Sequence, residues 1–217
     1  MQTLEKMTIG EYVAKDFRTA AVFSKYGIDF CCKGNRTIEE ACEKKDIDTD
    51  QLMDQLNTVL STKNDSAIDF KSWPLDLLAD YIEKTHHRYV QEKTQVILPF
   101  LDKLCKVHGA NHPELFEINE LFIGCAGELA QHLIKEEQIL FPFIKKMVKA
   151  SLTDEAIAQP QFGTVNNPIA MMMEEHEAEG DRFVKIAELT NNYTPPADAC
   201  STYRVTFAML SDFEQDL

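Results

Sequence analysis

Short helical patterns occupy the first sixty or so residues of the chain. Thr8-Ile9-Gly10-Glu11 and Thr37-Ile38-Glu39-Glu40 both have the form of a capping box, in which a hydroxyl and a carboxylate bond the free amides of a helix start. Between them, the stretch from Phe17 to Tyr26 has helical spacing, and another such stretch runs from Asp48 to Leu60. We therefore expect a small helical domain at the N-terminus.

Polar residues interrupt this pattern and precede four much longer helical patterns. We expect the N-terminal domain to cover residues 1–62 and residues 63–74, which end in Pro74, to form a linker. The long patterns then run over about 75–107, 113–150, 168–191 and 197–217, with short loops between them and almost no strand alternation. The predicted fold is therefore all-α, with a small N-terminal domain followed along the chain by an up-and-down four-helix bundle over residues 75–217.

Charge and composition exclude several classes of partner. The 217 residues carry a formal net charge of -14 and no run of Lys or Arg, so neither a nucleic acid nor an anionic membrane surface is expected as a partner. No leader pattern and no apolar stretch of roughly 18 residues is present, so we expect a cytoplasmic protein without a membrane span. The six scattered cysteines are expected to be reduced.

Histidines fall on the apolar stripes of the long helices. In the second helix, His132 and Glu136 share a stripe with Leu129, Leu133, Leu140 and Phe143, and in the third, His176 shares one with Ile169, Met172, Met173, Phe183 and Ala187. In the first helix, periodicity favours His86 over His87 as the more inward of the pair. Each of three helices is therefore expected to direct a histidine into the bundle.

The spacing of these histidines supports a common level in the bundle. His87 and His132 are 45 residues apart, and His132 and His176 are 44 apart, as expected when each helix and loop return the chain to one level. A further step of this length passes Leu217, and the last helix keeps its apolar period to that residue without a cap signal. We therefore expect a fourth ligand to lie beyond Leu217, so that this sequence is truncated just before it.

A metal centre explains this arrangement better than core packing does. A single histidine on an apolar stripe is most often a hydrogen-bonded core residue, but three at one level with a carboxylate one turn away are typical of carboxylate–histidine di-iron or di-manganese sites. The stripes carry no thiolate, which argues against structural zinc. Glu128 and Glu175 are candidates to accept a hydrogen bond from a ligand, although an exposed helix face explains them equally well.

Cys31 and Cys32 suggest separate chemistry in the N-terminal domain. They lie in a loop before the helix that starts after Thr37, with Lys33 and Arg36 nearby to favour thiolates. Redox chemistry or transient metal binding and a purely structural loop both fit this pattern, because adjacent cysteines carry no specific ligand spacing. His108 and His112, in the loop HGANHPEL, are candidates closer to an ordinary structural role.

Two segments resemble a known protein family. The segment Phe23-Ser24-Lys25-Tyr26-Gly27 followed by Asp29-Phe30-Cys31-Cys32-Lys33-Gly34, and the run from His132 to Pro142, HLIKEEQILFP, are similar to those of the di-iron proteins that repair iron-sulfur clusters, the RIC family. The resemblance extends over nearly the whole chain and includes TNNYTPP before the last helix. It implies a cysteine-containing N-terminal domain followed by a hemerythrin-like bundle.

The resemblance also implies a ligand set for two non-haem iron ions. It assigns His87, rather than His86, as the ligand from the first helix, and it assigns His132, Glu136 and His176 as the others. Under this assignment His86, Glu128 and Glu175 remain candidates to orient the ligands. The family's last His-x-x-x-Glu would fall beyond Leu217, so the resemblance implies an incomplete iron site in this chain, and Lys33 stands where the family commonly has glycine.

The function implied by the resemblance is the repair of iron-sulfur clusters damaged by nitrosative or oxidative stress, with this protein as an iron donor. Its expected partners are damaged iron-sulfur proteins and the small ligands NO or O2, and a homodimer would cover the exposed small domain. Two alternatives use the same site: a di-iron enzyme that reduces NO or activates O2, and an O2-sensing, NO-sensing or iron-storing hemerythrin-like module. Whether the protein is an enzyme stays open at this point.

Overall fold

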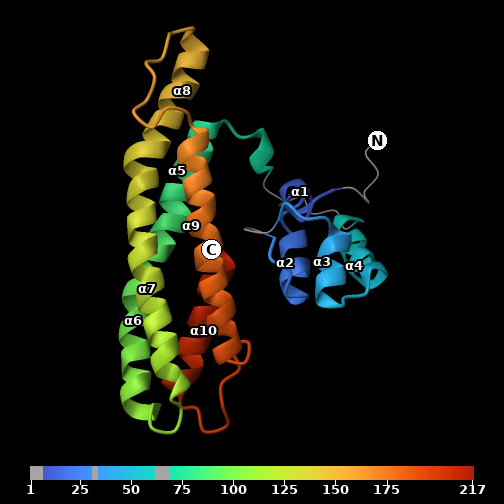
Figure 1. Ribbon diagram of the computed structural model, residues 1–217, viewed down its shortest axis with the longest axis vertical. Coiled ribbons are helices and arrows are strands. Elements are labelled where there is room, and N and C mark those ends of the chain that lie inside the picture. Colours follow the sequence, from blue (N-terminus) through green and yellow to red (C-terminus); the bar gives the residue numbers. More distant parts are fainter. Residues whose placement is uncertain (1–6, 31–33, 62–68) are drawn as a thin grey trace. The chain divides into compact units, whose positions relative to one another are not determined.

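The regular structure of the chain is helical. The computed structural model describes residues 7–30, 34–61 and 69–217, and it divides into two compact units, residues 1–73 and 74–217. Within the described residues no β-strand is present, and the one β-bridge joins Thr8 to Thr37 (Figure 1). The prediction of an all-α fold is therefore confirmed. Cys31 and Cys32 lie outside the described residues.

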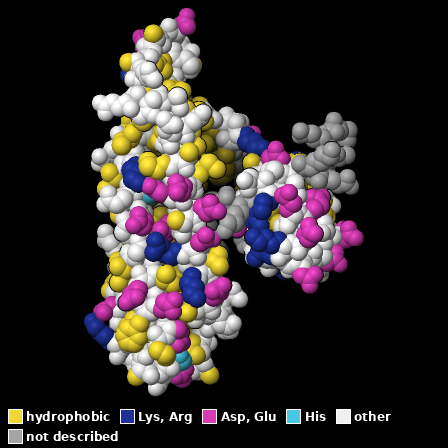
Figure 2. Space-filling model, viewed as in Figure 1, with side chains coloured by type: hydrophobic (Ala, Val, Ile, Leu, Met, Phe, Trp, Pro, Cys, Tyr) yellow, Lys and Arg dark blue, Asp and Glu magenta, His cyan; other side chains and the backbone are white. Residues whose placement is uncertain are grey.

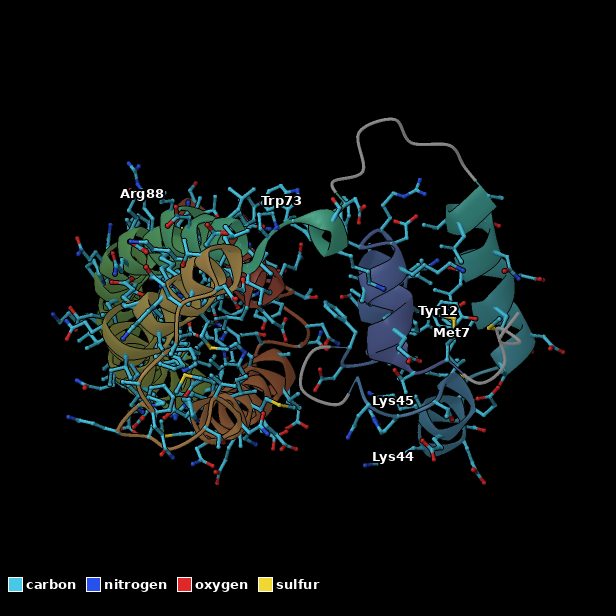
Figure 3. All side chains as sticks on the ribbon, turned by 90° about the horizontal axis from the view of Figure 1, so that it is seen from above. Met7, Tyr12, Lys44, Lys45, Trp73 and Arg88 are labelled. Atoms are coloured by element: carbon cyan, nitrogen blue, oxygen red, sulfur yellow. The ribbon has the colours of Figure 1, made fainter. Side chains whose placement is uncertain are left out.

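The N-terminal unit is built from short helices around its own apolar core. Its helices are α1 (Ile9–Lys15), α2 (Thr19–Lys25), α3 (Ile38–Lys45) and α4 (Thr49–Ser61). Both predicted capping boxes form, because Thr8 and Thr37 each exchange hydrogen bonds with the glutamate three residues later. Tyr12 points between the helices, whereas Lys44 and Lys45 lie on the surface (Figure 3). The fully buried side chains include Ile9, Tyr12, Phe23, Leu52 and Leu56.

Gly34 packs directly against the start of α1. The Gly10 amide donates to the Gly34 carbonyl at 2.7 Å, and a Cβ on Gly34 would lie 2.2 Å from the Phe30 carbonyl oxygen. Any side chain at position 34 would therefore force the backbone apart. Gly34, which ends the segment that starts at Asp29, is therefore held against the first turn of α1 by a contact that requires glycine.

Paired helical segments build the second unit. A short 3-10 turn, Phe70–Ser72, precedes it. Its helices are α5 (Leu75–Ile82), α6 (Arg88–His108), α7 (Glu114–Lys135), α8 (Phe141–Thr153), α9 (Asn166–Leu189) and α10 (Ser201–Asp216). A π-helical turn, Glu83–His87, joins α5 to α6, and a second one, Glu136–Leu140, joins α7 to α8. These segments run up and down as a bundle, with α10 beside its lower half (Figure 1). Among the described residues, no helix combines the length and apolar character needed to cross a membrane.

An aromatic cluster fixes three helices of this bundle to one another. The ring of Phe122 on α7 lies 6.4 Å from that of Phe183 on α9 and 5.3 Å from that of Phe213 on α10, measured between centroids. All three side chains are buried. This packing sets the spacing of α7 and α9 below the level of His132 and His176.

Replacing Phe122 should therefore destabilise the bundle strongly. We expect Phe122→Ala to lower the free energy of unfolding by about 3–5 kcal/mol, because it leaves a cavity among three helices. The matched control is Phe116→Ala on the same helix, where the side chain is 52% exposed and a loss of about 1 kcal/mol or less is expected. Urea denaturation followed by circular dichroism measures both, and equal losses would contradict this account of the core.

Candidate metal centre

Both π-helical turns lie at the level of the predicted ligands. A π turn has one more residue than an α turn, so it rotates the following residues by about 100° relative to an uninterrupted helix. In the turn that follows Ile82, this rotation brings His87, and not His86, onto the helix face that points into the bundle. His87 is 4% exposed and stacks on Phe141, with ring centroids 5.5 Å apart. The periodicity argument for His86 was therefore wrong, because it assumed a continuous α-helix.

The second π turn likewise changes which residues of the following segment face the bundle interior. Leu140 and Phe141 are buried, at 6% and 4% exposure, whereas Phe143, which the uninterrupted period placed inward, is only half-buried. Glu136 is the first residue of this turn and lies one helical turn after His132. The two π turns thus bring His87 and Glu136 together from neighbouring helices.

The Glu136 carboxylate lies between imidazoles from two helices. Its Oε2 is 2.9 Å from Nε2 of His87 and 3.6 Å from Nε2 of His132. The Nε2 atom of His132 is in turn 2.9 Å from Nε2 of His176 on α9. Three helical segments therefore direct three imidazole nitrogens and one carboxylate into the same region of the bundle.

A second layer of carboxylates holds the far side of two of these imidazoles. Nδ1 of His87 is 2.9 Å from Oε1 of Glu137, and Nδ1 of His132 is 2.8 Å from Oε2 of Glu175. Glu175 also binds the ammonium of Lys135. A carboxylate at Nδ1 favours the tautomer with the proton on that nitrogen, which is the tautomer whose Nε2 can bind a metal.

These contacts also set the charges of the cluster. Burial lowers the pKa of His87, but its hydrogen bonds to Glu136 and Glu137 outweigh this and raise the pKa above its ordinary value. Burial raises the pKa of Glu175, yet its bonds to Lys135 and His132 bring it below the ordinary value, so this carboxyl is ionised at neutral pH. A metal that binds Nε2 of His87 must displace the proton shared with Glu136.

The chemistry of these donors fits a first-row transition metal. Imidazole nitrogen and carboxylate oxygen suit iron or manganese, and a carboxylate can bridge two ions. Within the described ranges, no three His, Cys, Asp or Glu side chains are already arranged so that they could hold a metal ion. By their chemistry, the donors therefore fit such a metal.

Comparisons with known proteins match both parts of the chain. Residues 5–60 match a family model described as a domain of unknown function, DUF542, and residues 78–217 match the hemerythrin HHE cation binding domain. An iron-sulfur cluster repair protein of Staphylococcus haemolyticus, ScdA, is 30% identical over 96% of this chain and 89% of its own length. The chain belongs to this iron-sulfur cluster repair family. YtfE of Yersinia pestis, also named an iron-sulfur cluster repair protein, is 31% identical over 92% of this chain and 84% of its own.

Family membership does not locate individual side chains. The structure shows which of the residues expected to orient the ligands contact a ligand. Of the residues expected to orient ligands, Glu175 lies on His132, whereas His86 is half-exposed and contacts Asp216 at 3.2 Å. Glu128 is exposed. Sequence reasoning missed Glu137, because a residue inside a π turn does not follow the uninterrupted helical period.

The upper part of α9 differs from the predicted stripe. Ile169 and Met173 are 42% and 65% exposed, although both were expected to face inward with His176. His176 itself is exposed on one side. In Figure 1, α10 lies beside the lower half of the bundle. His176 is therefore the most accessible of the candidate ligands.

Proposed function

We propose that this protein binds two non-haem iron ions in its bundle and supplies iron to iron-sulfur clusters damaged by nitrosative or oxidative stress. His87, His132, His176 and Glu136 are the proposed ligands, with Glu136 bridging. The observation that carries the proposal is the Glu136 carboxylate, which contacts imidazoles from two helices, with a third imidazole bonded to the second. The names of the relatives support the repair role.

The residues around the ligands hold two of the imidazoles in place. Glu137 and Glu175 orient two imidazoles from behind, and buried Phe141 stacks on His87 and shields it from water. The proposed small-molecule ligands of this centre are NO and O2. Bound iron would supply Lewis acidity and a redox couple at this point.

The proposed partners are damaged iron-sulfur proteins, and the proposed location is the cytoplasm. Every cysteine of the described residues is a free thiol, namely Cys42, Cys105, Cys125 and Cys200, which suits a reducing compartment. Acidic side chains are scattered over the visible surface (Figure 2). The net charge of -14 favours clients with basic or neutral surfaces.

Repair and catalysis can be distinguished by stoichiometry. The iron-loaded protein is added to a purified iron-sulfur enzyme that peroxide has inactivated, and the recovered activity is compared with the iron supplied. An iron donor restores activity in proportion to its iron content and stops when that iron is used. Sustained consumption of NO or O2 over many turnovers, without recovery of the client, would instead establish the enzyme alternative.

The cysteine pair provides a separate prediction. We expect Cys31→Ser with Cys32→Ser to leave the iron content and the helical signal unchanged, because every proposed ligand lies in the other unit, and to reduce client reactivation severalfold. Iron analysis, circular dichroism and the reactivation assay measure the three quantities. Loss of iron equal to that of a ligand variant would contradict this separation of roles.

The carboxylate behind His87 provides another prediction. Glu137→Gln keeps the size of the side chain but removes the charge that holds Nδ1–H, so we expect iron to be retained about 10–100-fold less tightly. Competition with a coloured chelator measures the retention. Glu120→Gln, at an exposed position on α7, is the control and should behave as the unmodified chain does. An unchanged affinity in Glu137→Gln would show that the hydrogen bond does not support the site.

A further inference from the structure

A second cluster of reactive side chains lies at the other end of the bundle. His108 is the last residue of α6, and Cys200 is the N-cap of α10. His108 follows His87 by 21 residues along one helical path, a separation of about 30 Å at the rise of an α-helix. The α6–α7 and α9–α10 connections meet at this lower end, where histidine atoms reach the surface (Figures 1 and 2).

The two side chains contact each other directly. Nε2 of His108 lies 3.3 Å from Sγ of Cys200, although the two residues are 92 positions apart in the chain. The His108 ring also packs edge-on against Tyr203, with centroids 5.4 Å apart. Cys200 is exposed to solvent, and His108 is half-buried. A thiol and an imidazole are thus paired at a surface that a small reagent can reach.

A neighbouring ion pair holds the two connections in this position. Nε2 of His112 is 3.1 Å from both carboxylate oxygens of Asp198, and its Nδ1 is 3.1 Å from Oε1 of Glu114. These bonds raise the pKa of His112, led by the one to Asp198. The α9–α10 connection is therefore tied to the α6–α7 turn two residues before Cys200, which keeps the sulfur beside His108.

The surroundings of Cys200 favour its thiolate. The backbone amide of Tyr203, in the first turn of α10, is the main influence that lowers the pKa of Cys200 to about 7, followed by the bond to His108. Burial instead raises the pKa of Cys42, Cys105 and Cys125. Cys200 therefore differs from the other described cysteines in both access and ionisation.

We propose that Cys200 and His108 form a reactive thiol–imidazole pair that takes small disulfides into a mixed disulfide. The Cys200 sulfur, as its thiolate, attacks one sulfur of the disulfide, the S–S bond breaks, and a new S–S bond to Cys200 forms. The proton that the Cys200 thiol loses passes by way of the His108 imidazole to the leaving thiolate, so charge and electrons balance without a further oxidant. This modification site is independent of the iron centre.

The test uses the full chain and a neutral chromogenic disulfide, dithiodipyridine, with mass spectrometry to identify the modified cysteine. Near pH 6, we expect Cys200 to react about tenfold faster than the same cysteine in the urea-unfolded chain. The larger thiolate fraction outweighs the weaker nucleophilicity of a low-pKa thiol by about this factor. Cys200→Ser should abolish the fast phase and leave the slower cysteines.

Variants of the turn identify the role of the imidazole. His108→Ala should slow the Cys200 reaction at least threefold and move the pH midpoint of its rate upward, whereas Asn111→Ala, in the same turn and exposed, should change neither. Circular dichroism verifies that each variant is folded. The proposal is overturned if Cys200 reacts no faster than in the unfolded chain, or if folded His108→Ala keeps both the rate and the pH midpoint.

Discussion

Replacing His87 by alanine should remove most of the bound iron, whereas the same change at the adjacent His86 should remove little. His87 is 4% exposed and its Nε2 contacts the central carboxylate of Glu136 at 2.9 Å. His86 is half-exposed and contacts Asp216 instead. Because a lost ligand weakens metal binding more than a lost supporting contact, we expect the affinity for iron to fall by about 100-fold or more in His87→Ala.

The pair of variants is informative because both remove one imidazole from one helical turn. Iron content after anaerobic loading, measured by elemental analysis, gives the result, and circular dichroism verifies the fold. Equal iron loss in the two variants would indicate a general effect on the π-helical turn. Greater loss in His86→Ala would show that the uninterrupted period, and not the π turn, describes this helix in the iron-loaded protein.

Replacing Glu136 by glutamine should disturb the whole centre. Glutamine keeps the shape of the side chain but has no charge and only one acceptor oxygen, so it cannot bridge two ions as a carboxylate does. We therefore expect Glu136→Gln to lose the spectroscopic signature of coupled iron and to retain at most a single weakly held ion. Mössbauer spectroscopy with elemental analysis measures both quantities.

Glu128→Gln is the matched control for this variant. Glu128 lies two turns earlier on the same helix and is exposed, so its neutralisation should leave the iron content and the spectrum unchanged. Two tightly bound, coupled iron ions in Glu136→Gln would mean that another side chain supplies the bridge. Glu175 and Glu137 would then be the first residues to examine, because they already contact the ligand imidazoles.

Local pattern was sufficient to predict the helices and their starts. Thr8 and Thr37 cap helices as expected, because a capping box involves residues only three positions apart. The apolar period also placed His132 correctly on a buried stripe, since α7 is a regular α-helix from Glu114 to Lys135. Where a helix is regular, its inward face can be calculated from the sequence.

The prediction failed where the helix was not regular and where a helix face depends on its neighbours for cover. The π turn at Glu83–His87 exchanged His86 for His87 on the inward face, and Ile169 and Met173 lie exposed on α9. A π turn and the cover of a helix face depend on neighbouring helices, which no local period records. These errors have the same physical origin.

The sequence by itself therefore determined the helical elements, their caps, the level of the histidines and the resemblance to a cluster repair family. Only the tertiary structure decided which atoms meet: Glu136 with His87, Glu137 and Glu175 behind the imidazoles, and His108 with Cys200 across 92 residues. Helix propensity and capping act over a few residues, so a sequence displays them directly. Contacts between helices depend on how whole segments pack, and the atoms that carry the chemistry of this protein are brought together by that packing.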